Sequence, residues 1–226
     1  MNRSLVMRSC REDGVLLRPD KPATAIEASW QASFDSLEPI YAWGTFSQVG
    51  AARWSYLLGL NLVDALRVPM ESLDPAGLGL GWVAYEGWHG VSRKEFTELG
   101  PTNSSLVLPA CPQLSEMALG HSLWVVAPVL PGGWVFLGEE DKLVAASSRR
   151  LARWEATASS LQLTLLAAPG ESLAVAVLPP GERGTPLTAR CAAPADAGAA
   201  RPNAFGDVDV IVRVECVRTG AVCKCQ

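Results

Sequence analysis

The stretch that decides the fold is SLWVVAPVLPGGWVFLGEEDKLVAASSRRL, residues 122–151. It contains three short apolar runs, at residues 123–130, 134–137 and 143–146. Val and Trp suit a pleated, buried surface, and Gly supplies the positive φ that a short hairpin loop needs. Pro131-Gly132-Gly133 separates the first two runs, and Gly138-Glu139-Glu140-Asp141 separates the second from the third. The stretch therefore predicts a β-meander at the centre of a sandwich core.

Apolar and polar residues alternate in several other parts of the chain, as in half-buried strands. Further strands are expected at residues 41–49, 51–62, 82–85, 105–108, 161–165, 173–177 and 208–216. Ala168-Pro169-Gly170-Glu171 is typical of a hairpin turn. Residues 149–160 form the only plausible helix, although a polar strand fits them equally. Many short strands without βαβ alternation predict an all-β, antiparallel β-sandwich of one large or two adjoining sheets with little helix.

Changes in composition divide the chain into five parts. We expect a flexible arm (1–13), a β-sandwich body (14–178), an Ala/Pro/Gly-rich surface loop (179–206), a closing strand of the sandwich (207–217) and a Cys-containing tail (218–226).

The composition excludes several classes of protein. With 49% apolar and 19% charged residues, the 226-residue chain is not expected to be disordered. Its net charge of −4, without a basic stripe, argues against nucleic-acid binding. No apolar run approaches the ~20 residues of a membrane-spanning helix, and none near the N-terminus resembles a signal peptide. N-x-S sequons at Asn2 and Asn103 would suit a secreted parent protein, so the compartment stays open.

Motifs for metal or cofactor chemistry are missing from the sequence. There is no C-x-x-C pair, phosphate-binding loop, dinucleotide fingerprint or nucleophile elbow, and the chain has two histidines. We expect no metal and no cofactor. The six cysteines leave disulfides possible, with the pairing open: Cys10, Cys111, Cys191, Cys216, Cys223 and Cys225. The acidic group at residues 139–141 is interpreted as a solvated hairpin tip rather than a catalytic site.

The loop WVAYEGWHG, residues 82–90, is the strongest candidate for a ligand site. Its aromatic faces and polar groups are the materials of a sugar-binding platform. The residues concerned are Trp82, Tyr85, Glu86, Trp88 and His89. The simpler interpretation, which we favour, is that Trp82 and Tyr85 belong to the core and Trp88 covers a sheet edge.

Several collinear segments resemble the region that follows the catalytic barrel in α-galactosidase (melibiase)-like and raffinose-synthase-like glycoside hydrolases of plants and algae. GVLLRPDKPATAIEASW (14–30) resembles the phrase that leads from the barrel into the C-terminal β region. The later segments are RWSYLLGLNL (53–62), WVAYEGWHG (82–90), LPACPQ (108–113) and VVAPVLPGGWVFLGEEDKLVAASSRRL (125–151). The resemblance implies a parent enzyme that processes α-galactosyl units with two barrel aspartates. A (β/α)8 barrel needs about 200–250 residues of alternating strand and helix. This chain lacks that pattern, so no catalytic residue carries over.

Three functions are consistent with the sequence. The first is the non-catalytic C-terminal β-sandwich of such a hydrolase, in contact with the catalytic barrel and inactive alone. The second is a free-standing carbohydrate-binding module whose ligand is a galactoside or another oligosaccharide. The third is a structural or partner-binding β domain. In each case we expect no nucleic-acid or membrane partner.

Overall fold

The fold is all-β and antiparallel, as the sequence predicts. The computed structural model describes residues 3–26, 41–70, 80–87, 95–100, 105–112, 120–181, 184–195, 201–202 and 208–225. All the strand ladders within these ranges are antiparallel, and no (β/α)8 barrel is present among them. The one α-helix in these ranges, α1 (Arg3–Ser9), has seven residues. No helix in the described part is both long and apolar enough to span a bilayer.

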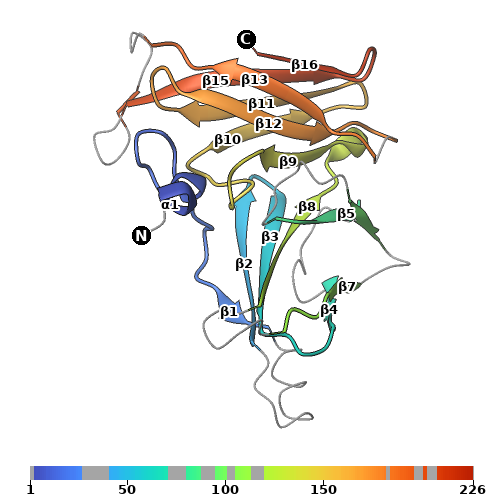
Figure 1. The fold of residues 1–226 in the computed structure, drawn as a ribbon. Helices are drawn as coiled ribbons and strands as arrows, with labels where there is room; N and C mark the ends of the chain where they lie inside the picture. The colour runs from blue at the N-terminus through green and yellow to red at the C-terminus, as the bar shows by residue number, and fades with distance from the viewer. Residues whose placement is uncertain are drawn as a thin grey trace.

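The larger sheet has six strands and forms the lower half of the molecule in Figure 1. Its strands follow the order β1-β2-β3-β8-β5-β6. Their bounds are β1 Thr24–Ala25, β2 Tyr41–Val49, β3 Ala52–Leu60, β8 His121–Pro128, β5 Trp82–Glu86 and β6 Thr97–Leu99. A two-stranded sheet, β4 (Leu66–Pro69) with β7 (Ser105–Leu108), packs on one face of this sheet.

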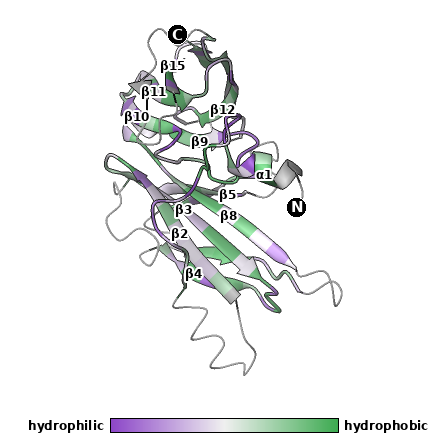
Figure 2. Ribbon diagram, turned by 90° about the vertical axis from the view of Figure 1, so that its left-hand side faces the viewer, coloured by the Kyte–Doolittle hydropathy of each residue, from purple (hydrophilic) through white to green (hydrophobic). Residues whose placement is uncertain are grey.

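The upper half is a sandwich of two further sheets, stacked above the six-stranded sheet in Figure 1. One sheet has the order β10-β11-β15-β14, with β16 also paired to β15, and the other has the order β13-β12-β9. Their bounds are β9 Val135–Glu139, β10 Leu151–Ala156, β11 Ser160–Ala167, β12 Ser172–Leu178, β13 Leu187–Ala192, β14 Arg201–Pro202, β15 Val208–Val217 and β16 Val222–Cys225. Figure 2 shows the six-stranded sheet running at an angle beneath this sandwich, with hydrophobic residues along the strands of both halves.

Two apolar cores explain why the six-stranded sheet is buried on both faces. Trp54 and Tyr56 of β3 belong to the main core, which continues into the sandwich through Phe136, Leu163 and Val175. The opposite face packs in a second core against β4 and β7. The period of two predicted the strand at 51–62, but residues on both of its faces are buried, because each face meets a different layer.

The opening stretch does not form the predicted meander. Strand β8 pairs with β3 and β5, whereas β9 pairs with β12, so the chain crosses from one sheet to the other at the 3₁₀ turn Pro131–Gly133. Glycine is required at this crossing, because the backbone there is left-handed and packs closely against a neighbouring segment. At Gly132, φ is +76°, and a Cβ there would lie 2.1 Å from the carbonyl oxygen of Thr157. The turn Ala168-Pro169-Gly170-Glu171 also connects two different sheets, since it leads from β11 to β12. The hairpin predicted there is therefore wrong as well.

Other sequence-based expectations are corrected by the structure. The candidate helix at 149–160 contains strand β10, the alternative that its sequence left open. The expected surface loop at 179–206 contains β13, with Ala189 and Cys191 buried in the main core. The expected closing strand at 207–217 contains β15, which lies inside its sheet, between β11 and β16. The expected flexible arm carries α1 and the fully buried Arg11, which forms ion pairs with Asp13 and Asp209.

Two disulfides tie the C-terminal tail into the sandwich. Cys216 pairs with Cys223 between β15 and β16, and Cys191 of β13 pairs with Cys225 of β16. Strand β16 therefore links the two sheets covalently, because its Cys223 is bonded to Cys216 of β15 and its Cys225 to Cys191 of β13.

Aromatic side chains join the six-stranded sheet to the sandwich by hydrogen bonds. Trp54 Nε1 donates to the carbonyl of Phe136 at 2.9 Å, and the Tyr85 hydroxyl donates to the carbonyl of Leu137. The Tyr56 hydroxyl donates to the carbonyl of Ala146 at 2.8 Å and accepts from the amide of the same residue at 3.0 Å. Burial raises the pKa of both tyrosines, so these hydroxyls remain protonated donors.

Replacing Tyr56 by Phe tests this junction. We expect Tyr56→Phe to lower the free energy of unfolding by about 1–3 kcal/mol, because the buried amide and carbonyl of Ala146 lose their partner. Thr45, opposite Tyr56 on β2, provides the control, since Thr45→Val also removes one hydroxyl but breaks only an exposed hydrogen bond to Lys21. Urea unfolding measures both variants. Equal losses in the two would contradict a special role for the junction.

Candidate functional site

The structure places two residues of the predicted sugar platform on opposite faces of β5. Tyr85 is 3% exposed and points into the main core, whereas Trp82 packs against the second core on the other face of the sheet. Residues three apart on a strand face opposite sides of the sheet, so the spacing of Trp82 and Tyr85 in the sequence already indicated that the two rings would be separated. Glu86 lies at the end of β5, in register with Trp124. Trp88 and His89 lie outside the described residues. For Trp82 and Tyr85 the interpretation as core residues is the correct one.

The acidic turn is not the solvated tip that the sequence suggested. Glu139 is the last residue of β9, only 8% exposed, and its Oε2 lies 2.9 Å from Nε of Arg150. Glu140 bonds to Thr188 and Arg190 of β13, and Asp141 is exposed. The prediction fails at Glu139 because β9 extends two residues further than the turn signal implied, through Gly138 to Glu139.

Arg150 and Glu171, each 1% exposed, form the most buried ion pair of the described part. Nη2 of Arg150 lies 2.7 Å from Oε1 of Glu171, and Nη1 lies 3.0 Å from Oε2. The Glu171 carboxylate also accepts the amides of Ala168 at 2.8 Å and Glu12 at 3.1 Å. Four donors therefore occupy this carboxylate, and one of them belongs to the N-terminal segment.

The two carboxylates that bind Arg150 have opposite pKa shifts. Burial raises the pKa of Glu139 above its ordinary value, and the attraction of Arg150 offsets only part of that rise. For Glu171, burial also acts to raise the pKa, but the hydrogen bonds and charge of Arg150 outweigh it, so the pKa is lowered. One guanidinium stabilises two anions, and the better-hydrogen-bonded one stays charged more readily.

A cleft of about 570 Å³ opens beside this network, between β12, β13 and the turn after β9. A buried carboxylate with a raised pKa at a cleft is a general signal for acid–base chemistry. Here Glu139 is held by Arg150, and the lining cations are engaged as well. Lys142 donates to the carbonyls of Met7 and Cys10, and Arg190 pairs with Glu140. We therefore interpret the network as a fastening of the N-terminal segment to the sandwich.

Replacing either glutamate by Gln separates their contributions. We expect Glu171→Gln to lower the free energy of unfolding by about 3–5 kcal/mol at pH 7, because it breaks a fully buried pair. Glu139→Gln should cost much less, since Arg150 keeps Glu171 and burial favours the neutral form at residue 139. Glu155→Gln, in an exposed ion pair with Arg153, is the matched control and should change stability by less than about 1 kcal/mol. Guanidinium unfolding that ranks Glu139→Gln at or above Glu171→Gln would contradict this assignment.

The same two residues predict how stability depends on pH. The folded-state pKa of Glu171 is lowered. The contribution of Glu171 to the free energy of unfolding is therefore complete above the ordinary pKa of 4.5, and it disappears as the pH falls through the folded-state pKa. The folded-state pKa of Glu139 is raised, so its contribution decreases as the pH rises from 4.5 through the folded value. The Glu171→Gln deficit should therefore shrink below pH 4.5. Relative to the wild type, Glu139→Gln should gain stability as the pH rises above 4.5. Denaturation midpoints across this range, with wild type as reference, measure both trends.

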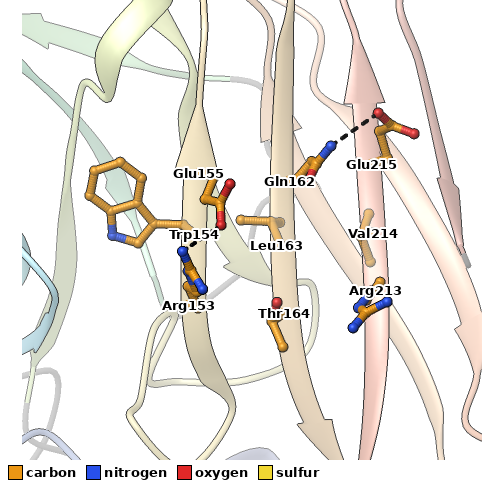
Figure 3. A pocket seen from close by; sticks show the side chains of 9 residues that line it. All are labelled: Arg153, Trp154, Glu155, Gln162, Leu163, Thr164, Arg213, Val214 and Glu215. Carbon is orange, nitrogen blue, oxygen red and sulfur yellow. Dashed lines mark hydrogen bonds and ion pairs between the residues drawn. The ribbon is translucent and has the colours of Figure 1, made fainter.

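A second feature is a polar trough on the outer face of β10, β11 and β15 (Figure 3). Strand pairing aligns two rows of polar side chains across the three strands. One row is Arg153, Thr164 and Arg213; the other is Glu155, Gln162 and Glu215. The trough between them has a volume of about 270 Å³. The sequence contains these residues as polar pairs two apart on each strand, but the register that aligns them depends on strand pairing.

A third feature is an apolar groove of about 550 Å³ where the six-stranded sheet meets the connection between β9 and β10. It is lined by Pro19, Ala23, Trp43, Thr45, Tyr56, Leu58, Leu123, Leu143 and Val144. The sequence placed several of these residues in strands, but it gave no sign that they would stay uncovered.

No protein-family model and no curated protein matches the sequence significantly.

Within the described ranges, no three His, Cys, Asp or Glu side chains are placed to hold a metal ion.

Proposed function

We propose that this chain is the non-catalytic β-sandwich portion of an α-galactosidase- or raffinose-synthase-like glycoside hydrolase, and that it supports the catalytic barrel. One observation carries the proposal: the apolar groove is lined in part by the segment that resembles the exit from such a barrel. Pro19 and Ala23 belong to residues 14–30, whose sequence carries that resemblance, and both contact the groove. A barrel that leads into this segment would therefore end beside the groove.

The chemistry of the groove suits another protein surface better than a polar ligand. Trp43, Leu58 and Leu123 are half-buried and face it from β2, β3 and β8. Tyr56 also lines it, but its hydroxyl is already bonded to Ala146. An apolar surface of this kind on a folded domain usually marks a contact with a partner. Covering the groove removes these side chains from water and stabilises the assembly.

The buried carboxylates argue for a supporting rather than a catalytic role. Retaining glycosidases need two carboxyls about 5–5.5 Å apart on either side of an open sugar site. Glu139 and Glu171 are brought together here, but both bind Arg150, and four donors surround Glu171. In the proposal the catalytic aspartates belong to the barrel.

The groove predicts binding of the fluorescent probe anilinonaphthalene sulfonate by the isolated chain. We expect the double substitution Leu58→Gln with Leu123→Gln to remove most of the fluorescence increase, because it replaces two apolar lining residues with amides. Ile211→Gln is the control, since Ile211 is an exposed apolar residue on β15, outside the groove. Circular dichroism checks that all variants fold. Unchanged fluorescence in the double variant would show that the groove is not the exposed apolar surface.

The identity of the partner is tested by the transcript upstream of Met1 and by reconstitution. An in-frame barrel-coding region supports the proposal, and co-expression with that barrel should suppress probe binding. A stop codon directly upstream, or probe binding that persists in the presence of the barrel, would contradict it.

A further inference from the structure

The polar trough on β10, β11 and β15 has the dimensions of a small ligand site. Its two walls are side chains two residues apart on each strand, which places them about 7 Å apart. Three strands at about 4.8 Å spacing give each wall a length of about 10 Å. The floor is the main chain of Trp154, Leu163 and Val214, the row between the walls. Leu163 and Val214 are buried in the main core, so they leave the trough open.

The walls offer complementary hydrogen-bonding groups. Arg153, Arg213 and the hydroxyl of Thr164 present donors on one side, and Glu155, Glu215 and the amide of Gln162 present mainly acceptors on the other (Figure 3). A sugar hydroxyl both donates and accepts, so adjacent hydroxyls of one ring can bond to both walls. A ligand with donors or acceptors alone would satisfy one wall only.

The charge balance selects against ionic ligands. Two arginines face two glutamates, so the lining has no net charge. An anion would be attracted to the arginines and repelled by Glu155 and Glu215. A cation would be attracted to the glutamates and repelled by the arginines. A neutral polar ligand avoids both penalties.

Part of the lining is already prepared for a ligand. Arg213 has no hydrogen-bond or ion-pair partner in the part of the chain that the structure describes. Gln162 lies 3.4 Å from Glu215, which orients the amide along its wall. Arg153 pairs with Glu155 at 2.8 Å, and both are exposed enough to exchange this contact for one with a ligand.

We infer that this trough is a binding site for a neutral, hydroxyl-rich ligand, namely a short oligosaccharide. It contains no aromatic platform, because the Trp154 indole turns away and donates to the carbonyl of Val49 at 2.8 Å (Figure 3). Recognition by hydrogen bonds alone, against competing water, gives weak binding of about millimolar strength. The trough shares no lining residue with the apolar groove, so this inference does not depend on whether a barrel docks on the groove.

Titration of the full chain with raffinose and with maltotriose, followed by amide chemical shifts, tests the inference. We expect saturable shifts confined to β10, β11 and β15. Arg213→Ala should raise the dissociation constant about tenfold by removing charge-assisted hydrogen bonds. Gln162→Ala, on the opposite wall, is a second variant with the same expected direction. Arg67→Ala, an exposed arginine of β4 outside the trough, is the control and should leave binding unchanged.

Charge variants of one monosaccharide test the neutral selectivity. Galactose should bind more tightly than galacturonate and more tightly than galactosamine, because each charged sugar meets one repulsive wall. No saturable shift with either oligosaccharide up to about 0.1 M, which is far above millimolar affinity, would overturn the inference. So would shifts elsewhere in the chain, shifts insensitive to both wall variants, or tighter binding of a charged sugar. None of these results bears on probe binding in the apolar groove, so the two proposals fail separately.

Discussion

Hydrogen bonds from aromatic side chains to main-chain carbonyls hold the six-stranded sheet and the sandwich together. The segment after β8 leaves one sheet, forms a short strand in another and then runs irregularly to β10. Such a path through a core leaves carbonyls that no ladder satisfies, and each would cost free energy if unpaired. From the six-stranded sheet, Trp54 and Tyr85 donate to carbonyls of β9, which is an edge strand, and Tyr56 donates to a carbonyl of the irregular connection. Trp134 and Trp154 make the same kind of bond to carbonyls outside the segment. Large apolar rings with a polar tip fill the space and satisfy the backbone at once.

Buried charge fastens the N-terminal segment to the same body. Arg11 reaches Asp209 of β15 at 2.5 Å, and the amide of Glu12 bonds to the Glu171 carboxylate that Arg150 holds. Buried pairs contribute little net stability, because desolvation consumes most of their attraction. What they impose is a particular arrangement, since any other docking of the segment would leave a buried charge unpaired. The segment at 14–26, which lines the apolar groove, is thereby held in place from its N-terminal side.

The sequence predicted strands well and their partners poorly, for a physical reason. Alternation depends on which residues a strand buries, and it identified the strands at 41–49, 51–62, 161–165 and 173–177. Pairing depends on which sheet the chain enters after each turn, and a Pro-Gly turn serves a hairpin and a crossing equally well. The deciding contact at Gly132 is with Thr157, and no local pattern encodes it. The candidate site was predicted less well: Glu139 looked solvated because the irregular connection between β9 and β10, which no sequence pattern predicts, brings Arg150 back onto its carboxylate. Similarly, the rows of the trough exist only once β10, β11 and β15 are in register.

Tyr56 shows how the apolar groove and the internal junction depend on each other. Its ring lines the groove, while its hydroxyl bonds to both the amide and the carbonyl of Ala146. A partner that covers the groove removes water from the neighbourhood of these bonds, and a hydrogen bond strengthens in a less polar environment. Docking on the groove should therefore stabilise the junction between the sheet and the sandwich. The side chains that wall the trough lie on the outer face of β10, β11 and β15 and make none of the bonds to Phe136, Leu137 or Ala146. A ligand in the trough is therefore separated from these three bonds, whereas a partner on the groove lies directly beside the Tyr56 bond.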